Sequence, residues 1–146
     1  SILNLLLWLG HKRKNLDIYR IENLLQTDET WGTHKYRITN VLKHLGLKFK
    51  EKRRVKTKEI DRALKDGKGV IYLYMFSRDI GHYIFFYGRT EKCFLAANDI
   101  SSHNKPQMRR SKKFYGMCAQ KYSKTYRDRF FGVYPHAWFI ERDKND

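Results

Sequence analysis

GVIYLYMFSRDIGHYIFFYGRTEKCFLAANDI, residues 69–100, contains three short runs that are rich in aromatic and β-branched residues. The runs GVIYLYMF, HYIFFYG and KCFLAAN each have the length and composition of a β-strand. Only the residues RTE separate the last two runs after Gly88, which is a usual length for a hairpin turn. The stretch therefore predicts neighbouring antiparallel strands.

The residues before this stretch have helical patterns. Residues 2–9 are apolar at every position except Asn4, which is typical of a helix buried at the centre of a domain, and Gly10 supplies its C-terminal stop. Further helices are expected at 17–25, from a cap at Thr33 to Gly46, and from a cap at Thr57 to Gly67. Strands are expected around Phe49 and in HAWFIER at 136–142. Helices followed by antiparallel strands predict an α+β fold.

Length and composition limit the class of protein. The chain has 146 residues, enough for one domain, and its 41% hydrophobic content favours a packed globule. Cys93 and Cys118 form neither a disulfide framework nor a metal-ligand pattern, so we expect two reduced thiols in or near the core and no cofactor. No apolar run reaches the roughly 18 residues of a membrane span, and ILNLLLWLG lacks the basic segment that opens a signal peptide. The absence of disulfides favours an intracellular location and leaves the compartment open.

The charge is strongly positive, with 31 Lys and Arg against 15 Asp and Glu and a formal net charge of +16. This predicts attraction to polyanions such as nucleic acid or acidic proteins. We interpret residues 101–133 as a basic insertion within a single domain that spans 1–146. Its aromatic residues, such as Tyr122 and Phe130, either anchor a solvated loop to the core or stack on bases.

A nucleic-acid or anion-binding surface is therefore a candidate site, without a sequence-reading motif. Its candidate residues are Lys52, Arg53, Arg54, Arg109, Arg110, Lys112, Lys113, Lys121, Lys124 and Arg127.

His82 and Asp99 form the second candidate site. His82 opens one predicted strand and Asp99 follows the end of the next, so an antiparallel pairing brings both to the same edge of the sheet. An imidazole oriented by a carboxylate is the general-base half of a nucleophilic triad. Such a pair is also compatible with a structural histidine and an aspartate in a turn.

The order of the motifs resembles the papain-like cysteine peptidases, in the branch of the bacteriocin-processing, double-glycine peptidases. The matching pieces are SILNLLLWLG, GTHKYRITNVLKHLGL, IDRALKDGKGVIYLYM, GHYIFFYG and AANDIS, which together cover about Ser1 to Ser101. The resemblance implies that a buried first helix and further N-terminal helices pack on an antiparallel sheet. It implies that His82 is the base and Asp99 its orienting acid, with Asn98 as an alternate. Ile100 stands where the family usually has proline.

The resemblance also places a nucleophilic cysteine four residues before Ser1, with an oxyanion-hole glutamine upstream of it. Ser1 lies about one helical turn past that position, and neither Cys93 nor Cys118 has the setting of an activated thiol. We expect the cysteine in the parent protein and a peptide or protein substrate. The alternative is a catalytically inactive basic module of the same fold that binds nucleic acid or an acidic partner.

Overall fold

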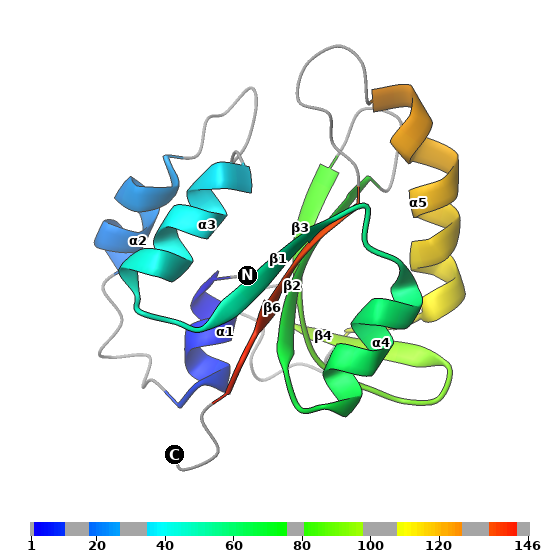
Figure 1. The fold of residues 1–146 in the computed structure, drawn as a ribbon, viewed down its shortest axis with the longest axis horizontal. Coiled ribbons are helices and arrows are strands. Elements are labelled where there is room, and N and C mark those ends of the chain that lie inside the picture. The colour runs from blue at the N-terminus through cyan, green and yellow to red at the C-terminus, as the bar shows by residue number, and fades with distance from the viewer. Residues whose placement is uncertain are drawn as a thin grey trace.

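The computed structural model describes residues 2–10, 18–26, 35–75, 81–97, 108–126 and 135–142. Within them, the helices are α1 (Ile2–Trp8), α2 (Ile18–Leu25), α3 (Lys35–His44), α4 (Thr57–Lys65) and α5 (Lys112–Tyr126). The strands are β1 (Phe49–Arg53), β2 (Gly69–Met75), β3 (Gly81–Arg89), β4 (Cys93–Ala97), β5 (Met108–Ser111) and β6 (His136–Ile140). They form one sheet in the order β1-β6-β2-β3-β4-β5, and every neighbouring pair is antiparallel (Figure 1). The α+β prediction is confirmed.

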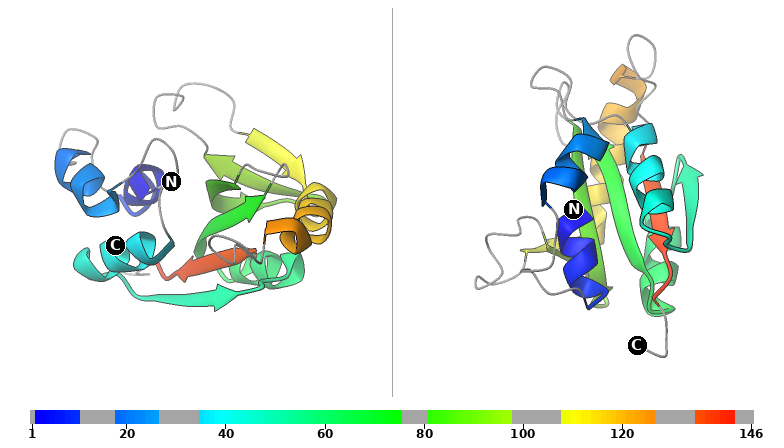
Figure 2. Two further views of the ribbon diagram at one scale, coloured as in Figure 1. Left: turned by 90° about the horizontal axis from the view of Figure 1, so that it is seen from above. Right: turned by 90° about the vertical axis from the view of Figure 1, so that its left-hand side faces the viewer.

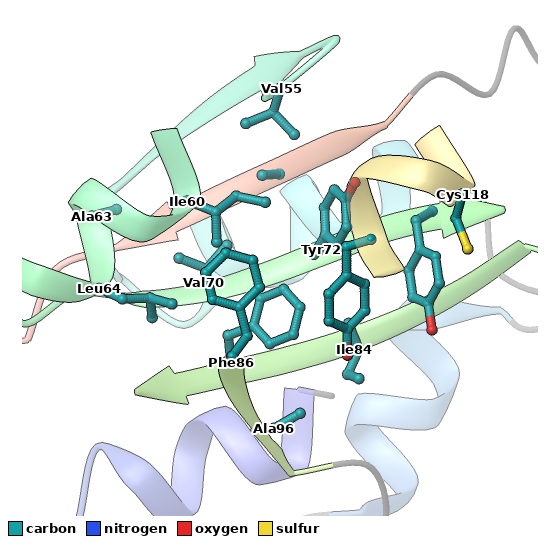
Figure 3. Packing of buried hydrophobic residues seen from close by; sticks show 14 residues of the cluster. Val55, Ile60, Ala63, Leu64, Val70, Tyr72, Ile84, Phe86, Ala96 and Cys118 are labelled. Carbon is teal, nitrogen blue, oxygen red and sulfur yellow. The ribbon is translucent and has the colours of Figure 1, made fainter. Parts of the chain in front are cut away.

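Helices cover both faces of the sheet, with α1, α2 and α3 on one face and α4 and α5 on the other (Figure 2). Alternate residues of each strand point to opposite faces. On β2, Ile71 and Leu73 pack with α1 to α3, whereas Tyr72 and Tyr74 pack with α4 and α5. Figure 3 shows the second core, in which Ile60 and Leu64 of α4 and Cys118 of α5 lie with Tyr72, Ile84 and Phe86 of the strands. The sheet is therefore buried on both sides, which explains why its central strands are almost entirely apolar.

The first helix packs directly on the centre of the sheet. Ile2, Leu5 and Leu6 are almost fully buried, and the Trp8 ring meets the Phe85 ring edge-on at a centroid distance of 5.6 Å. Glycine suits the position opposite this contact, because a Cβ atom at Gly69 would lie only 3.0 Å from both rings, closer than most real Cβ contacts. The predicted buried first helix is thus present as the layer between the sheet and α2.

The predicted helix ends are confirmed at three glycines. Gly10, Gly46 and Gly67 have φ angles of +100°, +70° and +83°, which favour glycine over residues with a side chain. The predicted cap at Thr57 was wrong by one residue, because Thr57 is already helical and Lys56 is the N-cap. There the Glu59 carboxylate accepts a hydrogen bond from the Lys56 backbone N–H at 3.2 Å, as the third residue of a helix does in a capping box. Thr33 lies outside the described residues.

Two elements within the basic segment 101–133 were not predicted. The strand β5 pairs with β4 at one edge of the sheet, and α5 then crosses the face that α4 also covers. Four residues, MRRS, carry no hydrophobic alternation, and Gly116 weakens the helical pattern of α5. The helix nevertheless begins at a conventional cap, where the Ser111 hydroxyl accepts a hydrogen bond from the Phe114 N–H at 3.1 Å.

In the part of the chain that the structure describes, we find no helix with the length and apolar character needed to cross a membrane.

Candidate active site

His82 is the second residue of β3 and lies at the end of the sheet where β3 begins and β2 ends. We call this the His82 end. Its cross-strand partner is Tyr74, and the two rings meet almost perpendicularly, at a centroid distance of 6.1 Å and an interplanar angle of 84°. The side chain of His82 is half-buried. The histidine is therefore accessible from the rim of the sheet while one side of its ring is covered.

The register places His82 on the α5 side of the sheet. It has the same strand parity as Ile84 and Phe86, which belong to the core beneath α4 and α5, and Tyr74 belongs to that core as well. The next residue, Tyr83, faces the opposite side and contacts the Trp138 ring at a centroid distance of 6.1 Å. Burial raises the pKa of the Tyr83 phenol.

The first helix points toward the His82 end from the other face. Trp8, its last residue, lies against Phe85 and Gly69, and Gly69 begins β2 at the far end of the sheet. Because α1 runs along the strands, its N-terminal end is directed toward the start of β3 (Figure 1). A group that precedes α1 would therefore approach His82 around the end of the strand rather than through the sheet.

The orienting acid cannot be placed by the described residues. Asp99 and the alternate Asn98 lie outside them, as does Ser1. The strand that leads to them ends at Ala97, whose partner on β3 is Phe85, so β4 runs toward the His82 end. Asp99 as the partner of His82 stays a prediction.

Neither cysteine supplies a nucleophile close to α1. Cys93 is half-buried at the first position of β4, opposite Ser111 and at the end of the strand away from Ala97. Cys118 is buried in the middle of α5, so the amide groups of the helix N-terminus do not reach its thiol. Neither sulfur forms a disulfide, as expected of reduced thiols. The described residues contain no cluster that could hold a metal ion.

The basic candidates fall on opposite edges of the sheet. Lys52 and Arg53 lie on β1 with Arg54 directly after it, and Arg109 and Arg110 lie on β5. These strands are separated by the full width of the sheet, roughly 24 Å if five interstrand spacings of about 4.8 Å are summed. The described residues thus form two separate basic groups, one at β1 and one at β5, rather than one continuous surface.

One cation and two aromatic side chains at the start of α5, next to the basic residues of β5, make contacts inside the protein. The half-buried Lys112 ammonium forms an ion pair with the Asp61 carboxylate at 2.7 Å and donates a hydrogen bond to the Glu91 carbonyl at 2.8 Å. Tyr115 is fully buried and Phe114 packs against the same core, so these two rings are not available to stack on bases. Lys113 is exposed on α5. The side chains of Lys121 and Lys124 and all of Arg127 lie outside what the structure describes.

Sequence reasoning missed a polar network that involves His136. The His136 Nε2–H donates to the Glu51 carboxylate at 2.9 Å, the Thr39 hydroxyl donates to the same oxygen at 2.8 Å, and Trp138 Nε1–H donates to Thr39 at 2.9 Å. The network ties β6, β1 and α3 together at the His82 end. The alternation of HAWFI, which places His136 and Trp138 on one face, is the signal that could have found it.

Comparison with known proteins identifies the fold. No family model matches the sequence, and neither does any curated protein. The peptidase domain of Streptococcus ComA, a bi-functional ABC transporter involved in a quorum-sensing pathway, superposes with a TM-score of 0.60 and 18% identity over 98% of this chain and 89% of that domain. The chain has the fold of a C39 peptidase domain. A C39-like peptidase from Bacillus anthracis gives a TM-score of 0.62 and 12% identity over 99% of this chain and 88% of its own.

The predicted papain-like, bacteriocin-processing peptidase fold is therefore confirmed. At these identities the likeness concerns the fold, and the roles of individual residues do not follow from it.

Proposed function

We propose that this domain supplies the base and the orienting acid of a thiol acyl-transfer hydrolase that acts on a peptide substrate. The observation that carries the proposal is the position of His82, half-buried at the start of β3, in a chain that shares its fold with two peptidase domains over nearly its whole length. Asp99 is the proposed orienting acid, and a cysteine in the segment that precedes Ser1 is the proposed nucleophile.

The proposed chemistry needs only these three groups and water. His82 takes the thiol proton, and the thiolate attacks the carbonyl carbon of the substrate. As the C–N bond breaks, His82 returns the proton to the departing amine, which leaves a thioester. Water, deprotonated by His82, then attacks the thioester carbonyl, and the thiol is released with its proton. A second amine in place of water would give transfer instead of hydrolysis.

The direction of α1 supports the position of the nucleophile. One further turn of helix before α1 extends it by about 5.4 Å toward the His82 end. The amide groups at the start of such a helix favour a thiolate over a thiol. Since α1 and His82 belong to opposite faces of the sheet, sulfur and imidazole must meet around the first residues of β3, where only Gly81 precedes the histidine on the strand.

The test is thiol alkylation of the full-length protein, including the segment before Ser1, with iodoacetamide. We expect one cysteine outside residues 1–146 to react faster than Cys93 and Cys118, and His82→Ala to slow it by at least about tenfold. The matched control is His44→Ala, which removes an exposed histidine of α3 and should leave the rate unchanged. Asp99→Asn is compared with Asp66→Asn in the same way. A preceding segment without cysteine, or equal rates in all variants, contradicts the proposal.

A basic binding module is the second candidate, favoured by the exposure of the cations around β1. Between residues 48 and 58, every Lys and Arg is exposed: Lys48, Lys50, Lys52, Arg53, Arg54, Lys56 and Lys58. Glu51, the one acid of this segment, already binds His136, and Glu59, which directly follows the segment, already binds Lys52. Lysines on an edge strand also protect it from pairing with another chain, which is a sufficient reason for some of them.

Binding to random-sequence DNA and RNA at increasing salt tests the second candidate. If phosphate contacts dominate, affinity falls steeply with salt, and Lys50→Gln with Arg53→Gln weakens binding and reduces the salt slope by about two. Lys65→Gln with Lys92→Gln removes the same charge elsewhere and serves as the control. Equal affinity of the two double variants would show that the charge near β1 forms no specific surface.

A further inference from the structure

Tyr74 contacts His82 and is itself buried in the core beneath α4 and α5. It lies on β2, directly opposite His82 in the antiparallel register, and its ring meets the imidazole edge-on at 6.1 Å. Cross-strand neighbours of this kind restrict each other's side-chain rotation. The contact therefore covers one side of the imidazole.

The Tyr74 ring is fixed by three further aromatic contacts. It stacks on Tyr72 at 5.4 Å with an interplanar angle of 8°, and it meets Tyr115 at 5.2 Å and Phe114 at 6.5 Å edge-on. Only 2% of Tyr74 is exposed. Two of these contacts come from α5. This helix, which was not predicted, therefore supports the Tyr74 ring that contacts His82.

We propose that Tyr74 is a positioning residue for His82 and that α5 acts on the proposed site through it. This inference rests on the proposed function in so far as His82 is a base. An aromatic ring suits the task because its van der Waals contact limits rotation of the imidazole.

Tyr72 provides a matched control for Tyr74. It lies two residues earlier on the same strand and on the same face, it is fully buried, and it contacts Tyr74 and Tyr115. Its cross-strand partner is Ile84 and not His82. Removing either ring damages the same core, whereas only the removal of Tyr74 frees the imidazole.

The first measurement does not depend on activity. In the full-length protein, three-bond NMR couplings of His82 report whether its χ1 angle has one value or an average of rotamers. We expect one rotamer in the wild type, in Tyr74→Phe and in Tyr72→Leu, and an averaged value in Tyr74→Leu. An unchanged coupling in folded Tyr74→Leu overturns the inference, whether or not the protein alkylates.

The second measurement is the pH profile of alkylation of the reactive cysteine. Tyr74→Leu should lower the plateau rate about tenfold or more, since small displacements of a catalytic group have large effects, and Tyr74→Phe should restore it. Tyr72→Leu should lose stability and keep the rate. If Tyr74→Leu does not fold, Tyr74→Met gives the same comparison, because it also removes the ring and its flexible side chain fills more of the vacated space. A wild type without a reactive cysteine contradicts the proposed function and leaves the NMR result to decide on Tyr74.

Discussion

The imidazole of His136 donates a hydrogen bond to the carboxylate of Glu51 across two neighbouring strands, over a distance of 2.9 Å. His136 is almost fully buried, and its pKa is lowered: burial, Lys35 and Arg53 lower it and together outweigh Glu51, which raises it. For Glu51, burial raises the pKa, but the hydrogen bonds from His136 and Thr39 outweigh burial, and the net pKa is lowered. The folded protein therefore holds a neutral imidazole that donates to an ionised carboxylate.

This pair predicts that the protein becomes less stable as pH falls. The folded state binds fewer protons than the unfolded chain, at His136 below the ordinary value of 6.5 and at Glu51 below 4.5. The free energy of unfolding should therefore fall as pH falls from about 7 to about 5 because His136 must protonate. Urea denaturation at both pH values should show a smaller fall for His136→Gln, while His44→Gln keeps the wild-type fall. Identical slopes for all three proteins would rule out His136 as the source.

The Thr39 hydroxyl is expected to contribute to stability through two partners. Thr39→Val leaves the buried Trp138 Nε1–H without its acceptor and Glu51 without one donor. An unsatisfied buried donor costs about 1–3 kcal/mol in the free energy of unfolding. The control is Thr57→Val on α4, whose hydroxyl has no hydrogen bond to another described residue. If the free energy of unfolding falls no more in Thr39→Val than in Thr57→Val, water replaces the Thr39 hydroxyl.

The sequence predicts those strands and helix ends that leave a periodic pattern or a glycine at a fixed position. The strands β2 and β3 follow from aromatic and β-branched runs, and the ends of α1, α3 and α4 follow from glycines that adopt positive φ angles. The sequence does not predict β5, because an edge strand is stabilised by backbone pairing with β4 and needs no apolar pattern. It also does not predict that His136 and Glu51 meet, since they are 85 residues apart and their proximity depends on β6 pairing with β1.

The candidate site shows the same division. His82 could be found because Gly81 and a strand pattern accompany it, and its pairing with Tyr74 requires only the hairpin of β2 and β3. The contacts between Tyr74 and α5 could not be predicted in this way. The lysines and the glycine of α5 interrupt the apolar pattern that would have indicated its buried residues Tyr115 and Cys118. Burial by a helix distant in the sequence is a property of the assembled core.

Gly69 is expected to tolerate no side chain. In Gly69→Ala the new Cβ would lie 3.0 Å from the rings of both Trp8 and Phe85, so α1 must move away from β3. Overpacking of this kind costs about 1–3 kcal/mol. Gly116→Ala is the matched control, because its Cβ would meet only the Thr57 methyl at 3.9 Å, and alanine favours the helix by up to about 1 kcal/mol. Thermal denaturation should therefore show a lower Tm for Gly69→Ala and an equal or higher Tm for Gly116→Ala. An unchanged Tm of Gly69→Ala would show that the Trp8 ring has room to turn.

Asp61 is the residue that joins α4 to β3 and α5 by charge. Its carboxylate binds Arg89 and bonds Lys112 at 2.7 Å, and the side chains of Asp61 and Lys112 are each 19% exposed. Burial raises the pKa of Asp61, but hydrogen bonds from Lys112 and Arg89 outweigh it and lower the pKa below its ordinary value of 3.8. The stabilisation is therefore present above that value and is lost as pH falls through the lowered pKa.

Asp61→Asn should leave two half-buried cations without their anion and lower the free energy of unfolding by about 1–3 kcal/mol at neutral pH. Asp66→Asn removes an exposed carboxylate at the end of the same helix and should cost much less. Urea denaturation of both variants at neutral pH and near pH 3 checks the electrostatic origin, because the difference between Asp61→Asn and the wild type should shrink as the carboxylate protonates. A difference that stays constant with pH would assign the loss to packing of the asparagine and not to the missing charge.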